Sequence, residues 1–384
     1  MKIALIENFG SDFYSARLRY ALFLQEKGHS VIAIVPDDGY VDKIRQAGIT
    51  TIALSTDIRK RSLKSILEFF KELRKIFKEE EFDVIHLYRM QPNLIGSMVA
   101  YIYSRKSKII NHITGLGVAF TKHSLKYKFI QFIIKSGYRA NNRFFKARLI
   151  FQNEEDKIEL GNNEDFTVIK GSAVNEDRFH PSITANEFLR SELENKIHID
   201  GKINLLFVSR LLKQKGLSYL IKAVQGYNGS ATGTLKVNLI VAGWIDSSNP
   251  DSFTAEEIEN FAGNDNVTFL GRRDNVNELI ALADIAVLPT FYREGTPRFL
   301  LEAMAMAKPI LTTDMPGCNH LVKEEPIRNG VLVKVQDSND IVRGLQYLLD
   351  NNISELGANS RLIYEKEFSE KVVYNQLLDI YMNQ

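Results

Sequence analysis

The segment from Glu294 to Pro297 has the residue types of a phosphate-binding turn. Glu294 and Gly295 lie in an expected loop after a strand, Thr296 can cap a helix, and Pro297 suits a first helical position. The first turn of a helix presents unpaired N–H groups with about half a positive charge behind them. We therefore expect phosphate to bind at this helix start, where Gly295 lets a ligand approach the backbone closely.

A second carboxylate, Glu302, follows eight positions after Glu294, between apolar neighbours of the same predicted helix. A carboxylate on so apolar a helix needs a partner. A ribose diol suits it, because two hydroxyl donors match two carboxylate oxygens. The alternative is an i,i+4 pair with Arg298, which contributes only about 0.2–0.5 kcal/mol.

Two cations, Arg210 and Lys215, flank the start of another predicted helix, and Gly216 follows them directly. Arg210 comes from the carboxyl end of the strand predicted over 204–209. An arginine fork and a lysine point charge can together hold a diphosphate. The alternative is an ordinary solvated basic loop.

The elements that must position these residues alternate between short β-rich runs and longer helical patterns, which is typical of parallel sheets covered on both faces. Helices are expected over 13–27, 62–79, 92–104 and 124–146 in the first half. Strands are expected over 2–8, 30–36, 51–54, 83–87, 108–113, 148–152 and 166–169, then over 204–209, 237–242, 267–270, 285–289, 309–312 and 331–335.

Thirteen strands are more than one sheet needs, and the polar, irregular stretch 171–201 separates the two series. We place the interdomain linker there. The expected fold is α/β, with two Rossmann-like, doubly wound domains facing a cleft, where the ligands of such sheets bind. The domains are assigned to 1–175 and 176–363, with a C-terminal helix over 364–384.

Composition limits the class of protein. The chain has 384 residues, 45% of them hydrophobic, and one cysteine, Cys318, most simply a small loop side chain. A single cysteine fits a reducing compartment, and no run of 18 apolar residues could span a bilayer. The short apolar run after Met1 is read as a strand rather than a secretory signal, so a cytoplasmic protein is expected.

Several motifs are absent. We find no Walker phosphate loop and no His-Glu-x-x-His. Gly-x-Gly-x-x-Gly is also absent, which disfavours a nicotinamide dehydrogenase. We also find no Asp-x-Asp pair for a divalent metal. No metal and no cofactor are therefore expected.

These residues resemble the retaining GT-B glycosyltransferases of family 4, over nearly the whole chain. That family carries a Glu–(seven residues)–Glu motif, matched by Glu294 and Glu302, and an Arg…Lys-Gly segment, matched by Arg210, Lys215 and Gly216. The resemblance implies that Glu294 contacts the donor sugar and Glu302 the ribose, while Arg210 and Lys215 hold the diphosphate. It implies catalytic roles for Glu294, Arg210 and Lys215, and donor contacts for these and for Gly271, Arg272, Gly295, Thr296, Pro297 and Glu302.

The segment Thr114-Gly115-Leu116-Gly117 is similar to bacterial members that extend polyprenyl-diphosphate-linked sugars, among them α-1,3-N-acetylgalactosaminyltransferases. The resemblance implies a UDP-sugar donor. UDP-N-acetylgalactosamine is the preferred candidate, and UDP-N-acetylglucosamine and UDP-galactose are the next candidates. It implies an acceptor linked to polyprenyl diphosphate, in contact with Gly10, Arg17, Thr114, Gly115 and Gly117. Many members have a histidine where Thr114 stands, so no histidine role is carried over. His86 is more simply a strand-end residue than an acid or base.

Charge is distributed unevenly along the chain. Residues 1–150 contain 26 Lys and Arg against 13 Asp and Glu, and residues 121–150 contain eight basic and no acidic side chains, interleaved with aromatic ones. A helix of this kind can lie in the headgroup region of an anionic membrane. The expected contacts are Lys122, Lys126, Lys128, Phe129, Phe132 and Lys135.

The alternatives for that helix are a domain helix with a solvated basic face, and a nucleic-acid surface. We favour the membrane and expect no nucleic-acid partner, so the protein is placed peripherally on the inner face of the cytoplasmic membrane. For the whole chain, a non-catalytic nucleotide-sugar-binding or scaffold protein of a polysaccharide complex remains the alternative of a different class.

Overall fold

The computed structural model describes residues 1–56, 62–122, 124–163, 165–197, 199–230, 235–247 and 249–383. The chain divides into two compact units, one of Met1–Ala173 with Glu370–Gln384, and one of Val174–Ser369. The second unit therefore continues six residues beyond the expected boundary at 363, because α14 (Ile353–Glu367) belongs to it.

The first unit contains a parallel sheet in the order β3-β2-β1-β4-β5-β6-β7. This is the doubly wound order of a Rossmann-like fold, in which the strand order reverses between β1 and β4. All of these strands except the edge strands β3 and β7 are buried on both faces, which explains their continuous apolar runs. The strands of this sheet are β1 (Lys2–Ile6), β2 (Ser30–Pro36), β3 (Thr50–Leu54), β4 (Val84–Tyr88), β5 (Lys108–Ile113), β6 (Arg148–Phe151) and β7 (Thr167–Val168).

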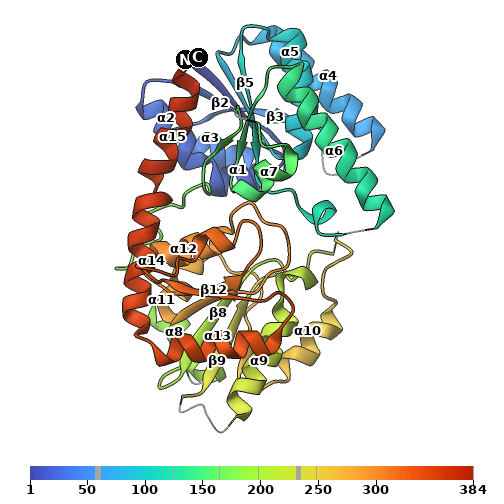
Figure 1. Cartoon of the computed structure of the whole chain (residues 1–384). Helices are drawn as coiled ribbons and strands as arrows, with labels where there is room; N and C mark the ends of the chain where they lie inside the picture. The colour runs from blue at the N-terminus through green and yellow to red at the C-terminus, as the bar shows by residue number, and fades with distance from the viewer. Residues whose placement is uncertain are drawn as a thin grey trace. The chain divides into compact units, whose positions relative to one another are not determined.

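Helices cover both faces of this sheet (Figure 1). The pattern predicted over 13–27 is two helices in the structure, and the pattern over 92–104 begins with a π-helical turn. The helices are α1 (Gly10–Ala16), α2 (Leu18–Glu26), α3 (Val41–Gln46), α4 (Leu63–Glu79), η2 (Pro92–Gly96), α5 (Ser97–Tyr103), the 3₁₀ turn η3 (Val118–Phe120), α6 (Leu125–Arg143) and α7 (Glu154–Leu160).

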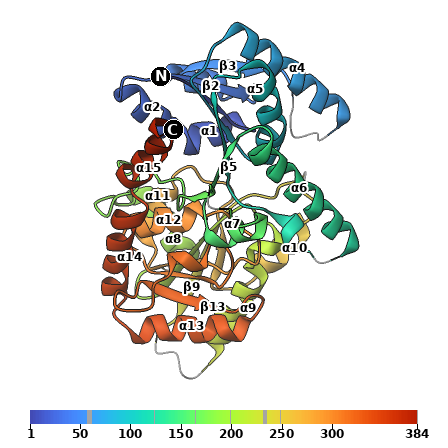
Figure 2. The ribbon, with the colours of Figure 1, turned by 45° about the horizontal axis from the view of Figure 1, so that its top comes forward.

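The C-terminal helix α15 (Glu370–Met382) packs on the first unit beside α2 (Figures 1 and 2). Tyr374 contacts Tyr20 with ring centroids 5.1 Å apart, and Arg19 forms a two-pronged bond with Glu370. The last helix thus completes one face of the first sheet with apolar and charged contacts together.

The second unit repeats the topology, with the order β10-β9-β8-β11-β12-β13 and a reversal between β8 and β11. One continuous apolar core lies between its sheet and helices. The strands are β8 (Ile203–Val208), β9 (Val237–Ala242), β10 (Val267–Phe269), β11 (Ile285–Leu288), β12 (Ile310–Thr313) and β13 (Gly330–Val333). The helices are α8 (Glu187–Ile197), the 3₁₀ turn η4 (Lys213–Lys215), α9 (Leu217–Gly229), α10 (Ala255–Ala262), α11 (Val276–Leu282), α12 (Arg298–Ala305), the 3₁₀ turn η5 (Asn319–Leu321), α13 (Ser338–Asp350) and α14.

The prediction that 171–201 is an irregular linker is wrong over much of its length. The units divide at Ala173, and α8 lies inside the predicted stretch. Leu189 and Leu193 of this helix are buried in the core of the second unit. Only two buried leucines among polar residues mark its inner face, which is too weak a pattern to distinguish it from a loop.

Candidate active site

The predicted donor residues lie at the carboxyl edge of the second sheet, next to its reversal point. Arg210 and Lys215 follow β8, and Glu294 follows β11, the strand that pairs with β8. Loops after neighbouring parallel strands emerge at the same edge, which is where doubly wound sheets bind their ligands.

Backbone contacts hold these two loops together. The Phe291 N–H donates to the Gln214 carbonyl at 2.8 Å, and the Thr290 hydroxyl donates to the same oxygen at 3.1 Å. Gly216 has a φ of +81°, and a Cβ there would lie 2.0 Å from the Pro289 carbonyl oxygen. Glycine is therefore required at the point where the loop of Lys215 meets the end of β11.

This close approach joins Lys215 to Glu294. The Lys215 ammonium donates to Oε1 of Glu294, and the side chains are only 11% and 14% exposed. The Lys215 nitrogen also lies 5.0 Å from the ring centroid of Tyr292. The structure thus places a cation and a carboxylate in direct contact in a site largely withdrawn from water.

The loop after β12 packs against the backbone of Glu294 and Gly295. Gly317 has a φ of +84°, and a Cβ on it would lie 2.3 Å from the Gly295 carbonyl oxygen. Cys318, next to it, is fully buried, and burial raises the pKa of its thiol, so it stays protonated at neutral pH. The cysteine therefore acts as a packing residue, in agreement with the simplest prediction.

The helix that follows Glu294 begins one residue later than predicted. Pro297 is the N-cap of α12 and the first helical residue is Arg298, so Thr296 does not cap the helix. Its hydroxyl instead lies 3.4 Å from Nε2 of His320. Proline has no side-chain acceptor, so the helix start keeps the polarity that favours an anion.

Glu302 lies on the first turns of α12 and has cationic neighbours. Arg298 contacts it at 3.5 Å, as the alternative reading expected, and the two side chains are 29% and 13% exposed. Burial raises the pKa of Glu302, while the positive charges of Arg298 and Arg178 oppose that rise. Arg178 donates a hydrogen bond to the Asp274 carbonyl. Sequence reasoning missed Arg178, because it stands in the stretch taken as a linker.

The predicted donor residues Arg210, Gly271 and Arg272 follow β8 and β10 at the same edge of the sheet. Arg210 pairs with Asp246 of the loop after β9, at 3.1 Å. Gly271 and Arg272 follow β10, and Gly271 has a φ of +68°. The structure thus joins Lys215 to Glu294 and Arg298 to Glu302, while it pairs Arg210 with an aspartate that the sequence did not single out.

In the first unit, the predicted acceptor residue Arg17 is 7% exposed and lies 3.4 Å from the buried Glu7. The guanidinium of Arg89 also bonds to Glu7, at 3.0 Å, and to Asp12. Arg89 has a φ of +68°, which is strained for a residue with a side chain. Sequence reasoning missed Arg89, although it lies two residues after the strand predicted over 83–87 and directly follows β4 in the structure. Its side chain is 40% exposed, so it is the more accessible cation of this network.

Gly10 begins α1, where a Cβ would lie 2.4 Å from a carboxylate oxygen of Asp38. The loop after β5 carries Thr114, and its two glycines have φ values of +113° at position 115 and +69° at position 117. Leu116 between them is buried. Both predicted acceptor segments therefore follow strands of the first sheet at its carboxyl edge.

His86 lies inside β4 and is fully buried, among side chains rather than backbone partners. Its ring stacks on the rings of Tyr88 and His112, with centroids 4.2 Å and 5.4 Å away. Its Nδ1 is hydrogen-bonded to the Tyr381 hydroxyl of α15. Burial lowers the pKa of both histidines well below the ordinary value. The cluster joins α15 to the centre of the first sheet, which is a structural role.

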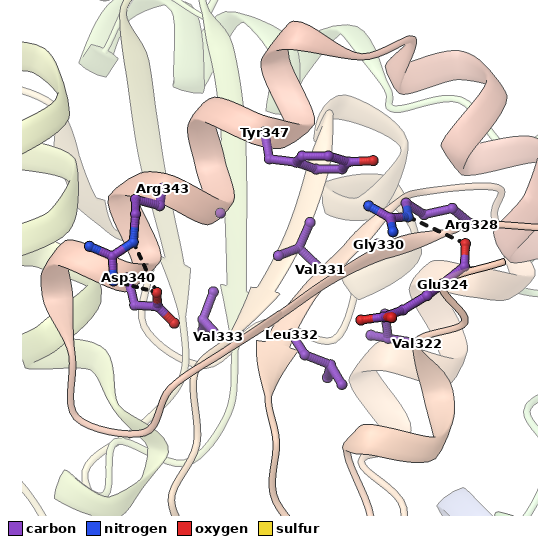
Figure 3. A pocket seen from close by; sticks show the side chains of 11 residues that line it. Val322, Glu324, Arg328, Gly330, Val331, Leu332, Val333, Asp340, Arg343 and Tyr347 are labelled. Carbon is purple, nitrogen blue, oxygen red and sulfur yellow. Dashed lines mark hydrogen bonds and ion pairs between the residues drawn. The ribbon is translucent and has the colours of Figure 1, made fainter.

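A hollow of about 210 Å³ opens at the edge strand β13, away from β8 and β11 (Figure 3). Its charged side chains are engaged locally: Arg343 pairs with Asp340, and Arg328 bonds to the Glu324 carbonyl and lies over the Tyr347 ring. None of the predicted site residues lines it.

Comparison with known proteins identifies the family. Residues 190–366 match the family model for group 1 glycosyl transferases, and residues 2–153 match the glycosyl transferase 4-like model. The two matches together cover more than half of the chain, which therefore belongs to the family 4 glycosyltransferases with the GT-B fold.

The chain is 27% identical to the N,N'-diacetylbacillosaminyl-diphospho-undecaprenol alpha-1,3-N-acetylgalactosaminyltransferase of Campylobacter jejuni, over 99% of this chain and 98% of that protein. It is 22% identical to the UDP-Gal:alpha-D-GlcNAc-diphosphoundecaprenol alpha-1,3-galactosyltransferase of Escherichia coli, over 89% of this chain and 84% of that one. Among solved structures, sucrose-phosphate synthase of Thermosynechococcus elongatus matches with a TM-score of 0.80 and 19% identity, covering 100% of this chain and 98% of that one. This last likeness confirms the fold.

Proposed function

We propose that this glycosyltransferase transfers N-acetylgalactosamine, with retention, from UDP-N-acetylgalactosamine to a saccharide linked to polyprenyl diphosphate. The observation that carries the donor half is the convergence of Lys215, Glu294 and the start of α12 at the reversal point of the second sheet. The full-length similarity to the Campylobacter enzyme supports the sugar and the acceptor, because its name contains both.

In this proposal the second unit neutralises the leaving nucleotide. Lys215, Arg210 and the start of α12 stabilise the charge that develops on the diphosphate, without a divalent metal ion. Glu302 accepts hydrogen bonds from the ribose hydroxyls, and Glu294 orients the hydroxyls of the sugar. These are roles for preorganised groups, which is consistent with the burial of the Lys215–Glu294 pair.

The transfer step needs no covalent intermediate with the protein. The bond between the anomeric carbon and the diphosphate oxygen breaks, and the acceptor oxygen bonds to that carbon on the same face. The acceptor proton passes to the departing phosphate oxygen. Donor-sugar orientation by Glu294 and charge neutralisation by Lys215 then carry most of the catalysis.

The acceptor is proposed to bind the first unit at Gly10 and the loop of Thr114, Gly115 and Gly117. Arg17 is buried on Glu7 and over the Tyr88 ring, with its guanidinium carbon 4.1 Å from the ring centroid. We assign it to holding this edge of the sheet, with Arg89 as the more exposed neighbouring cation.

We propose that α6 docks the protein on the inner face of the cytoplasmic membrane. Its inner side is buried through Ile134 and Tyr138, whereas Leu125, Phe129 and Phe132 are 84%, 64% and 65% exposed. The half-exposed Ile133 adds to this apolar side, and the exposed Lys126 and Lys128 flank it. Large apolar side chains beside lysines suit an anionic lipid surface. Lys135 is paired with Glu159 at 2.6 Å, so it contributes less to membrane binding.

None of the helices that the structure describes has the long apolar run needed to cross a bilayer.

Two alternatives remain to be separated by experiment. UDP-N-acetylglucosamine and UDP-galactose are the next donors, the latter because the Escherichia coli relative names UDP-Gal. A scaffold that binds nucleotide sugars without turnover would bind UDP and release none from UDP-sugars.

Calorimetry with UDP and GDP tests the nucleotide, and UDP release from the three UDP-sugars, with and without a lipid-linked acceptor, tests turnover. We expect UDP to bind more tightly than GDP, and UDP-N-acetylgalactosamine to be turned over fastest when acceptor is present. NMR of the product should show the anomeric configuration of the donor. Preference for GDP, or an inverted product, contradicts the proposal.

A further inference from the structure

Helix α6 lies at the surface of the first unit (Figures 1 and 2), but its two sides are reversed relative to an ordinary surface helix. Such a helix buries apolar side chains and exposes polar ones. In α6, which lies wholly within the described residues 124–163, the buried side chains are Ile134, Tyr138 and Asn141, while Phe129 and Phe132 are exposed. Two of the three buried side chains carry polar groups, so apolar packing alone does not account for the inner side of α6.

Hydrogen bonds join this inner side to the π-helical turn η2. The Asn141 amide donates to the Asn93 carbonyl at 2.7 Å, and the Asn93 amide donates to the Tyr138 hydroxyl at 3.3 Å. Asn93 and Asn141 are 0% and 2% exposed. Gly137 allows the close approach, because a Cβ there would lie 3.0 Å from Cδ2 of Leu94. Buried hydrogen bonds are directional, so they fix the orientation of α6 on η2.

The same turn is bonded to Arg89 at the carboxyl edge of the first sheet. The Asn93 N–H donates to the Arg89 carbonyl at 3.0 Å, and Arg89 has the strained φ of +68°. The Arg89 guanidinium bonds to Glu7 and Asp12. Strained residues and π-helical turns are frequent at functional sites. A short path of hydrogen bonds therefore runs from the inner side of α6 to the edge at which the acceptor is proposed to bind.

We propose that Asn93 and Asn141 are positioning residues that align the acceptor edge of the first unit with the membrane surface. The outer side of α6 meets the lipid, and the two asparagines hold its inner side to the turn of Arg89. A lipid-linked acceptor is anchored in the membrane, so the orientation of the acceptor edge to the lipid decides whether the saccharide reaches the site. This inference rests on the proposed function and on the docking of α6. It assigns the two residues to acceptor delivery and leaves donor binding, in the second unit, unchanged.

The test compares a membrane-bound acceptor with a soluble one in Asn141→Leu, which removes the amide donor at similar volume. The Asn93 carbonyl also accepts from the Ser97 N–H, so it keeps a partner and the variant should fold. One acceptor is embedded in vesicles of phosphatidylglycerol and phosphatidylethanolamine, and the other carries the same saccharide diphosphate on a short, water-soluble chain. KM for the embedded acceptor should rise roughly tenfold, the order of one lost hydrogen bond, while kcat changes little. KM for the soluble acceptor, flotation with the vesicles and UDP affinity should match the wild type.

The matched control is Asn142→Leu, since the Asn142 amide donates to the Ala147 carbonyl at 3.2 Å and not to η2. It should behave as the wild type with both acceptors. If melting curves show Asn141→Leu unfolded at the assay temperature, Asn141→Ala, which also lacks the amide, takes its place. An unchanged KM for the embedded acceptor, or an equal rise for both acceptors, overturns the inference and leaves the proposed function standing. A wild type that binds no UDP and transfers to neither acceptor overturns the proposed function itself.

Discussion

The ammonium of Lys215 is bonded to the carboxylate of Glu294, across the reversal point of the second sheet. Each side chain comes from the loop after a different strand, and each is largely buried. Removing one partner of such a pair leaves the other charge uncompensated. The pair therefore keeps both groups in place before the donor arrives. In the proposed mechanism, the diphosphate of the donor then binds Lys215, and the hydroxyls of its sugar bind Glu294.

The first prediction concerns Lys215. Lys215→Met removes one charge-assisted contact with the diphosphate and should weaken UDP binding roughly tenfold to hundredfold, measured by calorimetry. Lys213→Met is the control, because Lys213 is 52% exposed and pairs with Glu257 instead. Equal UDP affinity in both variants would place the diphosphate elsewhere.

The second prediction concerns Glu302. If its carboxylate binds the ribose, Glu302→Gln should weaken UDP binding, and the loss should be smaller for 2′-deoxy-UDP, which lacks one hydroxyl. Because burial raises the pKa of Glu302, ribose binding by the ionised form should decline as the pH falls, and the decline should begin at higher pH than for an ordinary glutamate.

Calorimetric titration with both nucleotides across acidic to neutral pH gives the measurement. The pH dependence should disappear in Glu302→Gln. A discrimination between UDP and 2′-deoxy-UDP that survives the substitution in full would assign Glu302 to its ion pair with Arg298 alone.

The third prediction concerns the histidine cluster under α15. His86 and His112 face each other, Arg17, Tyr88 and Tyr381, and burial lowers the pKa of both imidazoles. The unfolded chain therefore binds more protons than the folded chain below about pH 6.5. The contribution of the two neutral histidines to the free energy of unfolding is therefore fully present above that pH. It should fall by about 1 kcal/mol per histidine between pH 7.5 and pH 5.5.

Urea unfolding at pH 7.5 and 5.5, followed by a signal from the first unit, measures this loss. His112→Asn should reduce the difference between the two pH values, because one titrating group is gone. An unchanged difference would mean that other groups dominate the acid response.

The fourth prediction concerns α6. Replacing Phe129 and Phe132 with glutamate should abolish flotation with liposomes that contain anionic lipid, because it removes exposed apolar area and adds like charge. Phe188→Glu is the control, since Phe188 is 79% exposed in the second unit. If the wild type floats equally well with neutral liposomes, or if the double variant floats as well as the wild type, α6 is not the membrane-binding element.

The strands could be predicted to within two residues at each end, and without error at 108–113 and 237–242, because buried parallel strands are short apolar runs between polar breaks. Helix α8 could not be predicted in this way, because its inner face consists of few apolar residues. The break at Arg17 between α1 and α2 was also missed, because the apolar period continues across it.

The proposed donor residues could be selected from the sequence because their chemistry depends on local spacing around strand ends. Their partners could not be predicted. Asp246 and His320 are distant in sequence from Arg210 and Thr296, which they contact, and Arg178 is distant from Glu302, whose pKa its charge lowers; only the fold brings them together. The same holds for Tyr381, which reaches His86 from the opposite end of the sequence.

The role of Glu294 in transfer can be measured as UDP release and sugar transfer by Glu294→Gln, with UDP-N-acetylgalactosamine and a lipid-linked acceptor. Glu324→Gln, in the hollow at β13, serves as the control. Glu294→Gln should lose at least about a hundredfold in transfer rate at a temperature where the variant is still folded, and Glu324→Gln should keep full activity. Transfer by Glu294→Gln within a few-fold of the wild type would contradict the assignment of the active site.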